Sequence, residues 1–221
     1  MFIEQPSKWL RWLYPKALWR MDENEHSVYL TFDDGPIPES TPYILKTLRD
    51  FDIKATFFVV GDNVRKYPEL YRQILEEGHQ VGNHTFNHVG SARHTIRFFE
   101  RNVDKCFRIM EENGLSCSGA EGRMKETGRK PLFRPPHGWM RPTQYLRYKN
   151  KMRIVMWDLV TRDYSKLLSP YDVVRNVKNY VRNGSIITFH DSLKSIDKLY
   201  FALPASLRYL KSQGYEFRTF D

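Results

Sequence analysis

The sequence contains few cysteines and no long apolar segment. Its 221 residues include two cysteines, Cys106 and Cys117, which are too few for a disulfide framework; each is free or bridged to the other. No apolar run approaches the roughly 18 residues that a membrane-spanning helix needs. Internal repeats and low-complexity linkers are also absent. A chain of this length buries enough surface for a full core, so we expect one large domain.

The first 21 residues also lack the pattern of a secretory signal. Cations and a proline interrupt every apolar run there, namely Lys8, Arg11, Pro15, Lys16 and Arg20. With no spanning helix either, a cytoplasmic location is the default expectation. Residues 7–20 mix tryptophans with cations and could therefore anchor on an anionic membrane. We favour the alternative, in which the tryptophans pack on the domain, because Pro15 breaks the helix.

Acidic residues are fewer than basic residues. The chain has 26 aspartates and glutamates and 35 lysines and arginines, which gives a net charge of +9. Such a surplus favours anionic partners, such as nucleic acid, an anionic glycan or a membrane surface. However, the cations are spread over every segment and no nucleic-acid-binding motif occurs. We expect no nucleic-acid partner, and a basic surface-binding module without catalysis is the remote alternative.

Strand-like and helix-like segments alternate along the chain. This alternation predicts a parallel sheet covered by helices, either a barrel or a doubly wound sheet. In both folds the active residues gather where strands end. A polar stretch at 116–131 has no periodicity and reads as a surface insertion. The expected strands are 27–32, 54–60, 79–82, 132–134, 153–157, 185–189 and 215–217, and the expected helices are 42–51, 68–77, 95–113, 143–149, 170–182 and 199–213.

Carboxylates and imidazoles follow two of these strands. Asp33 and Asp34 come after the first strand, and Gly35 lets the backbone turn so that both can face one site; a solvated Asp-Gly-Pro turn is the alternative. His84 and His88 are four residues apart and would share a face of a helical turn, near enough for one metal. Together with Asp34 they supply three ligands and leave a position for water, as in catalytic zinc sites. Iron(II), cobalt and nickel suit the same ligands.

Two further strand ends carry ionisable side chains. Arg134 precedes two prolines, so a rigid loop can aim its guanidinium at a carboxylate; a proline-rich turn with a surface arginine is the alternative. His190 directly follows the strand 185–189. It is either a core histidine or a proton donor, and its position favours the second.

Five motifs in order resemble those of the polysaccharide deacetylases (NodB-homology domain, carbohydrate esterase family four). They are TFDDGP (31–36), HTFNH (84–88), RPPHG (134–138), WDLVTRDY (157–164) and ITFHD (187–191). The resemblance covers about residues 28–217. It implies an α/β fold, a deformed (β/α) barrel with about seven parallel strands. We accordingly divide the chain into an N-terminal extension (1–26) and a catalytic domain (27–221).

The resemblance also implies a role for individual residues. Asp33 matches the general base, and Arg134 matches the arginine that tethers it. His190 matches the general acid, and Asp163 supports the arginine–histidine network. The metal ligands would be Asp34, His84 and His88, and the substrate-binding wall would be His137, Trp157, Ile187 and Tyr164.

Three of these positions depart from the family pattern. His137 stands where an aromatic residue is common, Tyr164 replaces a more usual tryptophan, and Ile187 replaces a more usual leucine. The metal and acid–base positions do not depart, so a pseudoenzyme is not expected.

The resemblance implies a metal-dependent hydrolase that removes acetyl groups from the N-acetylated sugars of a polysaccharide. The cofactor would be one divalent metal, zinc first, with cobalt or nickel as alternatives. Chitin-like chains, peptidoglycan and small acetylated sugars all fit this chemistry. An O-acetyl (xylan) esterase and a cyclic-amidase-like relative are the alternatives on the same scaffold.

Overall fold

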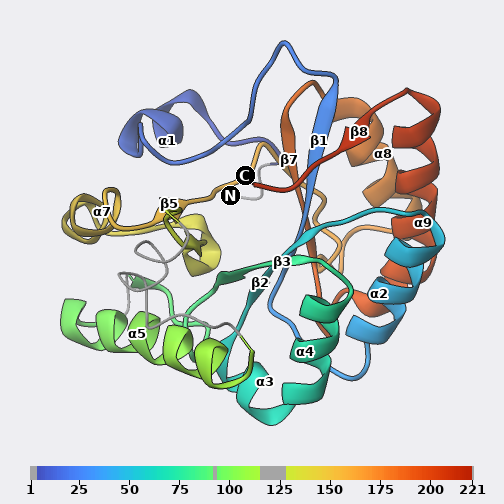
Figure 1. Ribbon diagram of the computed structural model, residues 1–221. Helices are drawn as coiled ribbons and strands as arrows, with labels where there is room; N and C mark the ends of the chain where they lie inside the picture. The colour runs from blue at the N-terminus through green and yellow to red at the C-terminus, as the bar shows by residue number, and fades with distance from the viewer. Residues whose placement is uncertain (1–3, 92–93, 115–127, 221) are drawn as a thin grey trace.

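Parallel strands form a strongly curved sheet at the centre of the molecule (Figure 1). The computed structural model describes residues 4–91, 94–114 and 128–220. Among these residues, seven strands follow the order β5-β4-β3-β2-β1-β7-β6, β8 pairs with the start of β1, and every pairing is parallel. The deformed barrel expected from the sequence is confirmed. The strands are β1 (Ser27–Asp33), β2 (Thr56–Val59), β3 (Gln80–Asn83), β4 (Leu132–Phe133), β5 (Arg153–Ile154), β6 (Leu159–Val160), β7 (Ser185–His190) and β8 (Glu216–Phe217).

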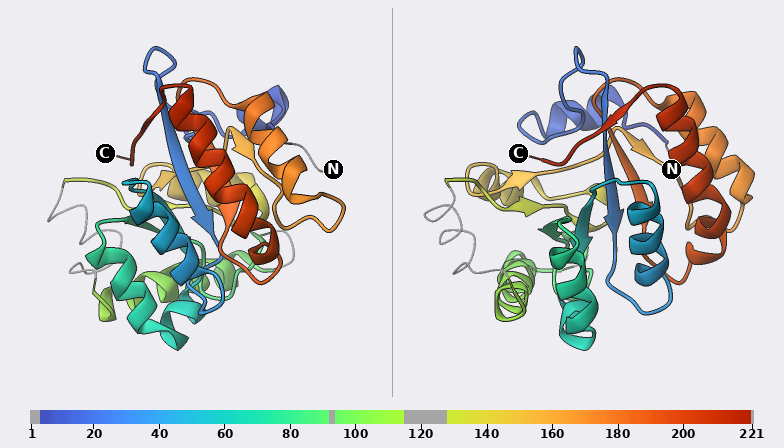
Figure 2. Two further views of the ribbon diagram at one scale, coloured as in Figure 1. Left: turned by 90° about the vertical axis from the view of Figure 1, so that its right-hand side faces the viewer. Right: turned by 45° about the vertical axis from the view of Figure 1, so that its right-hand side comes forward.

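Helices cover the outside of this sheet. Helices α2, α8 and α9 lie along one flank, and α3, α4 and α5 continue the layer around β2 and β3 (Figures 1 and 2). The helices are α1 (Lys8–Leu13), α2 (Thr41–Asp50), α3 (Gly61–Lys66), α4 (Pro68–Glu76), α5 (Ile96–Glu112), α7 (Pro142–Tyr148), α8 (Pro170–Tyr180) and α9 (Ile196–Ser212). Local signals fix their ends: the Thr95 side chain accepts a hydrogen bond from Phe98 N at the start of α5, and Ser169 caps α8.

The two faces of strand β1 pack into different hydrophobic cores. Leu30 and Phe32 on β1 are buried in the large core between sheet and helices. Tyr29 lies in a smaller core inside the barrel. Because side chains alternate along a strand, Thr31 and Asp33 share the inner face with Tyr29. The last residue of β1 therefore carries its carboxylate to the open end of the barrel.

The N-terminal segment bridges the edge strand β5 and the start of β7. The Leu18 backbone donates to Ile154 O at 2.8 Å and accepts from Met156 N at 2.8 Å, just beyond β5. On the other side, Arg20 forms a β-bridge with Ser185 on β7. Residues 18–20 thus lie in the seam that the strands leave open. The domain boundary after residue 26 stays a prediction.

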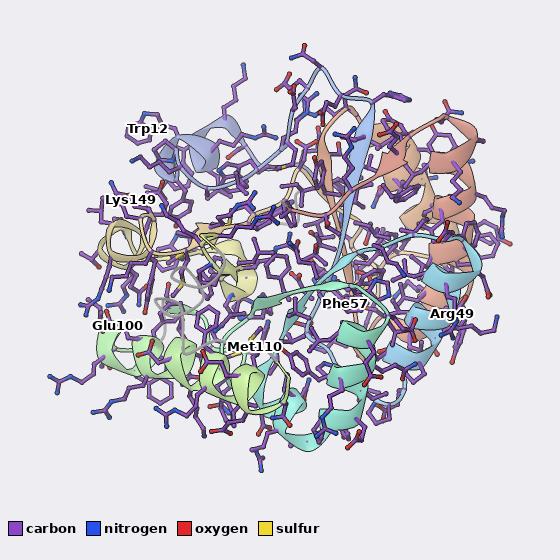
Figure 3. All side chains as sticks on the ribbon, in the orientation of Figure 1. Trp12, Arg49, Phe57, Glu100, Met110 and Lys149 are labelled. Atoms are coloured by element: carbon purple, nitrogen blue, oxygen red, sulfur yellow. The ribbon has the colours of Figure 1, made fainter. Side chains whose placement is uncertain are left out.

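The tryptophans of this segment behave differently from one another. Helix α1 ends at Leu13, before Pro15, as the sequence predicts. Trp19 is 6% exposed and packs edge-on against Trp157, with ring centroids 5.5 Å apart. Trp9 and Trp12 are 63% and 75% exposed, and Trp12 stands at the edge of the molecule in Figure 3. Packing on the domain therefore accounts for one of the three indoles.

Several local expectations are corrected. The strand expected at 153–157 ends at Ile154, and the chain then crosses to the opposite edge of the sheet to form β6. Helix α3 was not expected, because its six residues carry no clear period. Cys106 is free and buried. Cys117 and most of the insertion at 116–131 lie outside the described residues. No helix in the described ranges is long and apolar enough to cross a membrane.

Candidate active site

A cavity of about 810 Å³ opens where the strands of the barrel end. Nine of the eleven residues selected from the sequence line it; they are Asp33, Asp34, His84, His88, Arg134, His137, Trp157, Tyr164 and His190. The other two, Asp163 and Ile187, lie behind its wall. Strand ends thus bring together residues as distant in sequence as Asp33 and His190, which are 157 positions apart.

Asp34, His84 and His88 converge in this cavity. The Nε2 atoms of His88 and His84 lie 3.2 and 3.6 Å from Asp34 Oδ1. One ligand atom from each residue lies within 4.8 Å of the others. Asp34 Oδ1 is buried and accepts no well-formed hydrogen bond from the described residues. A buried oxygen without a hydrogen-bond donor is expected where a cation binds. The trio therefore fits one divalent metal ion.

The protonation of these groups also suits a metal. Burial lowers the pKa of His84 to about 4, so its ring is neutral at physiological pH, as a ligand must be. Its Nδ1 lies 2.8 Å from Arg134 O, and a hydrogen bond to this carbonyl leaves Nε2 as the lone-pair nitrogen. Burial alone would raise the pKa of Asp34, but nearby histidines, His190 foremost, lower it.

The backbone that carries the histidines is a loop and not the helical turn expected from their spacing. Thr85 and His88 both adopt left-handed conformations, with φ of 66° and 53°. These two residues bend the loop so that the rings of His84 and His88 approach to 5.0 Å between centroids. Such conformations are costly for residues other than glycine and gather at functional sites.

The turn after β1 is also made differently from the expectation. Asp34 itself has a φ of 84°, whereas Gly35 does not need the left-handed region. Gly35 is required for space, because a Cβ there would lie 2.0 Å from Asp191 Oδ2. Asp191 is fully buried and accepts hydrogen bonds from the hydroxyls of Ser40 and Thr41. It thus braces the turn that presents the two catalytic-site aspartates.

Asp33 is held by a buried arginine. Arg134 Nη1 donates to Asp33 Oδ1 at 2.6 Å and to Thr31 Oγ1 at 2.8 Å, and Arg134 Nη2 donates to Met156 O at 2.7 Å. The guanidinium is 2% exposed and lies 4.1 Å from the centre of the Phe58 ring. Asp33 Oδ2 receives no hydrogen bond from the described residues, so it is available to accept a proton.

His190 is paired with Asp163. The backbone N–H of His190 donates to Asp163 Oδ2 at 2.7 Å, and Nδ1 lies 2.8 Å from Asp163 Oδ1. Burial alone would lower the pKa of His190, but the Asp163 carboxylate outweighs it and the pKa rises to about 9. The Tyr164 ring lies edge-on to the imidazole, 4.6 Å between centroids. The imidazolium is therefore the dominant form at neutral pH.

The apolar wall differs from the expectation at one position. Trp157 lines the cavity and packs closely against Gly138. A Cβ added to Gly138 would lie 2.0 Å from the Trp157 ring. Ile187 does not line the cavity; it is fully buried in the core beneath the helices. Thr188, its neighbour on β7, takes the wall position together with His190. Alternation along the strand would have selected Thr188, which is two residues before His190.

Other residues of the cavity were not selected from the sequence. Asp191 directly follows His190, and that adjacency was the available signal. Asn63 on α3 donates from Nδ2 to Asp34 O at 2.8 Å. Ser7 and Leu10 reach the cavity from the N-terminal segment. Nothing local in the sequence reveals these last contacts, because they depend on tertiary packing.

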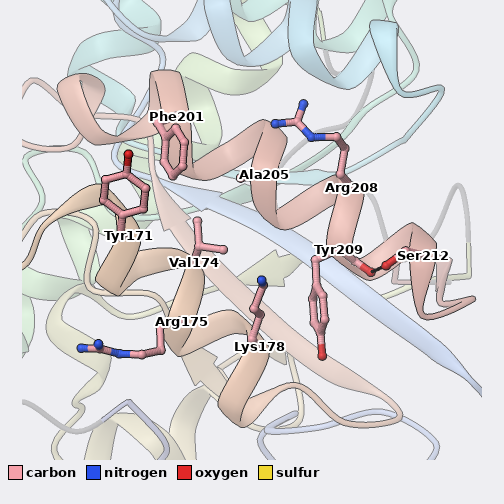
Figure 4. Close-up of a pocket in the computed structure, with 9 residues that line it drawn as sticks. All are labelled: Tyr171, Val174, Arg175, Lys178, Phe201, Ala205, Arg208, Tyr209 and Ser212. Atoms are coloured by element: carbon pink, nitrogen blue, oxygen red, sulfur yellow. Dashed lines mark hydrogen bonds between the residues drawn. The ribbon is translucent and has the colours of Figure 1, made fainter.

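A second cavity, about 620 Å³, lies between α8 and α9 (Figure 4). The described residues that line it include no carboxylate and no histidine. The described lining therefore offers none of the side chains that usually bind a metal ion. Its polar and aromatic lining includes Tyr171, Arg175, Lys178, Phe201, Arg208 and Tyr209.

Curated proteins similar to this chain are deacetylases. The chain is 31% identical over 204 residues to a peptidoglycan-N-acetylglucosamine deacetylase of Bacillus cereus, which covers 91% of this chain and 89% of the relative. It is 34% identical over 178 residues to a chitooligosaccharide deacetylase of Azorhizobium caulinodans, with 78% and 77% covered. It is 32% identical to the peptidoglycan-N-acetylmuramic acid deacetylase PdaC of Bacillus subtilis, but spans 39% of that longer protein.

Solved structures with the same fold include active and inactive proteins. The Bc1960 peptidoglycan N-acetylglucosamine deacetylase matches with a TM-score of 0.82 and 30% identity, over 97% of this chain and 94% of that one. A carbohydrate esterase family four pseudoenzyme of Bacillus anthracis, BA3943, matches with a TM-score of 0.72 and 26% identity, over 90% and 65%. Residues 20–156 match the family model described as polysaccharide deacetylase. Sequence, fold and relatives agree, and the chain belongs to the polysaccharide deacetylase family.

Proposed function

We propose that this enzyme removes the acetyl group from N-acetylglucosamine-type sugars of a glycan with the aid of one divalent metal ion. The observation that carries the proposal is the pairing of two opposite proton-transfer groups in one cavity. Asp33 is an acceptor held by Arg134, and His190 is a donor held by Asp163. Both line the cavity that contains the metal-ligand trio.

The ligands favour zinc, with cobalt and nickel as alternatives. Asp34, His84 and His88 offer one carboxylate and two imidazoles, a set common in hydrolytic zinc sites that keep a position for water. When bound, such an ion acts as a Lewis acid on the acetyl carbonyl.

Asp33 is proposed as the general base. Its free Oδ2 takes a proton from the attacking water, while Arg134 fixes the other oxygen and pairs with the carboxylate form. Arg134 is itself fixed by Thr31 and the carbonyl of Met156, so the carboxylate cannot rotate freely. This arrangement holds the base in position before the substrate arrives.

His190 is proposed as the general acid. When the carbon–nitrogen bond of the acetamide breaks, the departing amine needs a proton, and the His190 imidazolium supplies it. Asp163 keeps this ring charged and oriented through Nδ1, which leaves Nε2 for the substrate. The products are acetate and a free amino sugar.

The remaining walls position the substrate. Trp157 and Tyr164 offer aromatic surface for the acetyl methyl and the sugar, and a backbone N–H of the loop at His137 would stabilise the oxyanion. His137 stands where the family commonly has an aromatic residue, and its ring centroid is 5.0 Å from that of His88. We propose that this imidazole contacts the sugar.

The likeness to a pseudoenzyme shows that this fold does not by itself establish catalysis. The argument therefore rests on the side chains. The base contacts its arginine, the acid contacts its carboxylate, and the three ligands lie close together, which supports an active enzyme.

Acetate release from a substrate panel tests the proposal. The protein is loaded with zinc or cobalt and incubated with N-acetylglucosamine oligomers, peptidoglycan and acetylated xylan. We expect release from the N-acetylated substrates. Release from xylan alone would support an O-acetyl esterase, and no release from any substrate after metal loading would overturn the proposal.

A further inference from the structure

Helix α1 has an inner face that is fixed to the barrel. Ser7, its N-cap, and Leu10 line the catalytic cavity. Arg11 Nη2 donates to the buried Asp158 carboxylate at 2.6 Å. Just before the helix, Val160 N donates to Glu4 O at 2.8 Å. These contacts set the rotation of α1 about its own axis.

The outer face of α1 presents two indoles to solvent. Successive helix residues are about 100° apart, so Trp12 lies about 160° from Leu10, and Trp9 lies about 100° from it. Trp9 and Trp12 are three residues apart and share a face. They are 63% and 75% exposed, and Figure 3 places Trp12 at the periphery of the molecule. Two neighbouring indoles that are this exposed leave most of their apolar surface in water, which points to a partner.

Cations flank these indoles. Lys8 is four residues before Trp12 and lies on the same face, and exposed Lys16 follows the helix. Within residues 4–91, 94–114 and 128–220, no carboxylate forms an ion pair with Lys8 or Lys16, whereas Arg11 is paired. The whole chain is also positive, with a net charge of +9. We call Lys8, Trp9, Trp12 and Lys16 the indole face.

We propose that the indole face docks on an anionic lipid surface. Tryptophan prefers the boundary between lipid headgroups and acyl chains, and nearby lysines are attracted to anionic headgroups. A glycan strand is the competing partner, because sugars stack on indoles. It is disfavoured because Trp12 points away from the cavity that Leu10 lines, so a strand leaving the cavity would not follow the indoles.

Docking in this way would leave the catalytic cavity open and close to the bilayer. The opposite faces of a single short helix contact the cavity and the lipid. Lipid binding by the indole face does not depend on the deacetylase activity, so the lipid-docking proposal and the proposed function can fail separately.

Vesicle co-sedimentation of the full chain tests the proposal. Vesicles of phosphatidylcholine alone are compared with vesicles of phosphatidylcholine and phosphatidylglycerol in equal parts, at low and high salt. We expect binding to the anionic vesicles that weakens with salt. The double substitution Trp9→Ser and Trp12→Ser should reduce the partition coefficient on the order of tenfold, and Lys8→Glu with Lys16→Glu should abolish the salt dependence.

A matched control is the cavity between α8 and α9. Its Tyr171 and Phe201 are also exposed aromatics beside cations. The double substitution Tyr171→Ser and Phe201→Ser should leave vesicle binding unchanged. Circular dichroism and acetate release from a soluble oligosaccharide should be the same for the indole variant and the wild type, which shows that the fold and the cavity are intact.

Three results would overturn the proposal. The first is a wild-type protein that sediments with neither vesicle. The second is vesicle binding lost in the Tyr171 and Phe201 variant but kept in the Trp9 and Trp12 variant. The third is an indole variant that keeps vesicle binding but no longer pellets with an insoluble acetylated glycan, which would make the indole face a glycan platform.

Discussion

We propose different tasks for two adjacent aspartates because the surroundings of the two carboxylates differ. Asp33 contacts a guanidinium, whereas Asp34 faces two imidazoles. The substitution Asp33→Asn keeps the size of the side chain but cannot accept the proton. We expect kcat to fall about a thousandfold with the metal content unchanged. Activity assays and metal analysis check this result, and Asp34→Asn is the contrasting variant that should lose metal. A full rate in Asp33→Asn would show that another group is the base.

The acid should set the alkaline limit of activity. The pKa of His190 is raised from 6.5 to about 9, so the donor form is lost as the pH rises through about 9. The same shift makes the protonated ring stabilise the folded state fully below 6.5, and this contribution disappears as the pH rises through about 9. In Asp163→Asn the carboxylate is gone, and the alkaline limb of kcat/KM should move down towards neutral pH. An unchanged limb would assign it to another group.

Gly35 is a position where a single methyl group should be strongly disruptive. Its Cβ would lie 2.0 Å from Asp191 Oδ2, and Asp191 is fixed by two hydroxyls. We expect Gly35→Ala to lower the free energy of unfolding by about 1–3 kcal/mol and to reduce activity, because the turn with the aspartates must shift. Urea denaturation measures the first effect. Adding Asp191→Ala should recover part of the lost stability, and a purely additive loss would contradict the steric explanation.

At the scale of elements, helix α1 is tied to the barrel in part through one buried carboxylate. Asp158 accepts hydrogen bonds from Arg11, from Arg182 at 2.9 Å and from Ser185 at 2.8 Å. We expect Asp158→Asn to lower the free energy of unfolding by about 2 kcal/mol, because charge-assisted hydrogen bonds are lost. KM should rise as well, since α1 forms part of the cavity wall.

A surface ion pair provides the control for this variant. Arg49 contacts Glu77 at 2.9 Å, but its side chain is 58% exposed. Arg49→Ala should change the free energy of unfolding by less than about 1 kcal/mol and leave KM unchanged. Equal effects of Asp158→Asn and Arg49→Ala in urea titrations would contradict the role given to Asp158.

The elements that the sequence predicts well are those with their own local signals. Helix α5 has an amphipathic pattern and a threonine cap, and α8 has a serine capping box. Helix α3 and strand β6 are too short for a period to be visible. The loop of His84 and His88 imitates a helical turn because histidines four residues apart fit either backbone. Its left-handed residues are imposed by the site and not by local propensity.

At the scale of the whole molecule, a metal ion that binds only the native state should raise its stability. The ligands come from two separate loops, after β1 and after β3, so binding links parts of the chain that separate on unfolding. Chelation should therefore abolish acetate release and lower the melting temperature by several degrees, and zinc should restore both. Calorimetry with and without chelator measures the effect. His84→Ala should remove the difference, and a melting temperature insensitive to metal would contradict the site.

Most of the active site was predictable because a parallel sheet gathers its strand ends on one side. Asp33, His84, Arg134 and His190 each lie at the carboxyl end of a parallel strand, so the topology places them at the same end of the barrel. The position expected for Ile187 on the cavity wall is wrong, because the motif alone does not show the alternation of side chains along β7. The Ser7 and Leu10 contacts were beyond the reach of any local pattern.

The bridging position of the N-terminal segment has a consequence for how the chain folds. Its contacts with Met140, Tyr145 and Asn183 span 126, 129 and 163 residues of sequence. Contacts this distant form late, because the loop they close must first be ordered. During synthesis the seam of the barrel cannot close until the chain has been made as far as β7. Until then the inner face of the growing sheet stays exposed. Slowing translation after residue 156 should therefore lengthen the time in which nascent chains can aggregate.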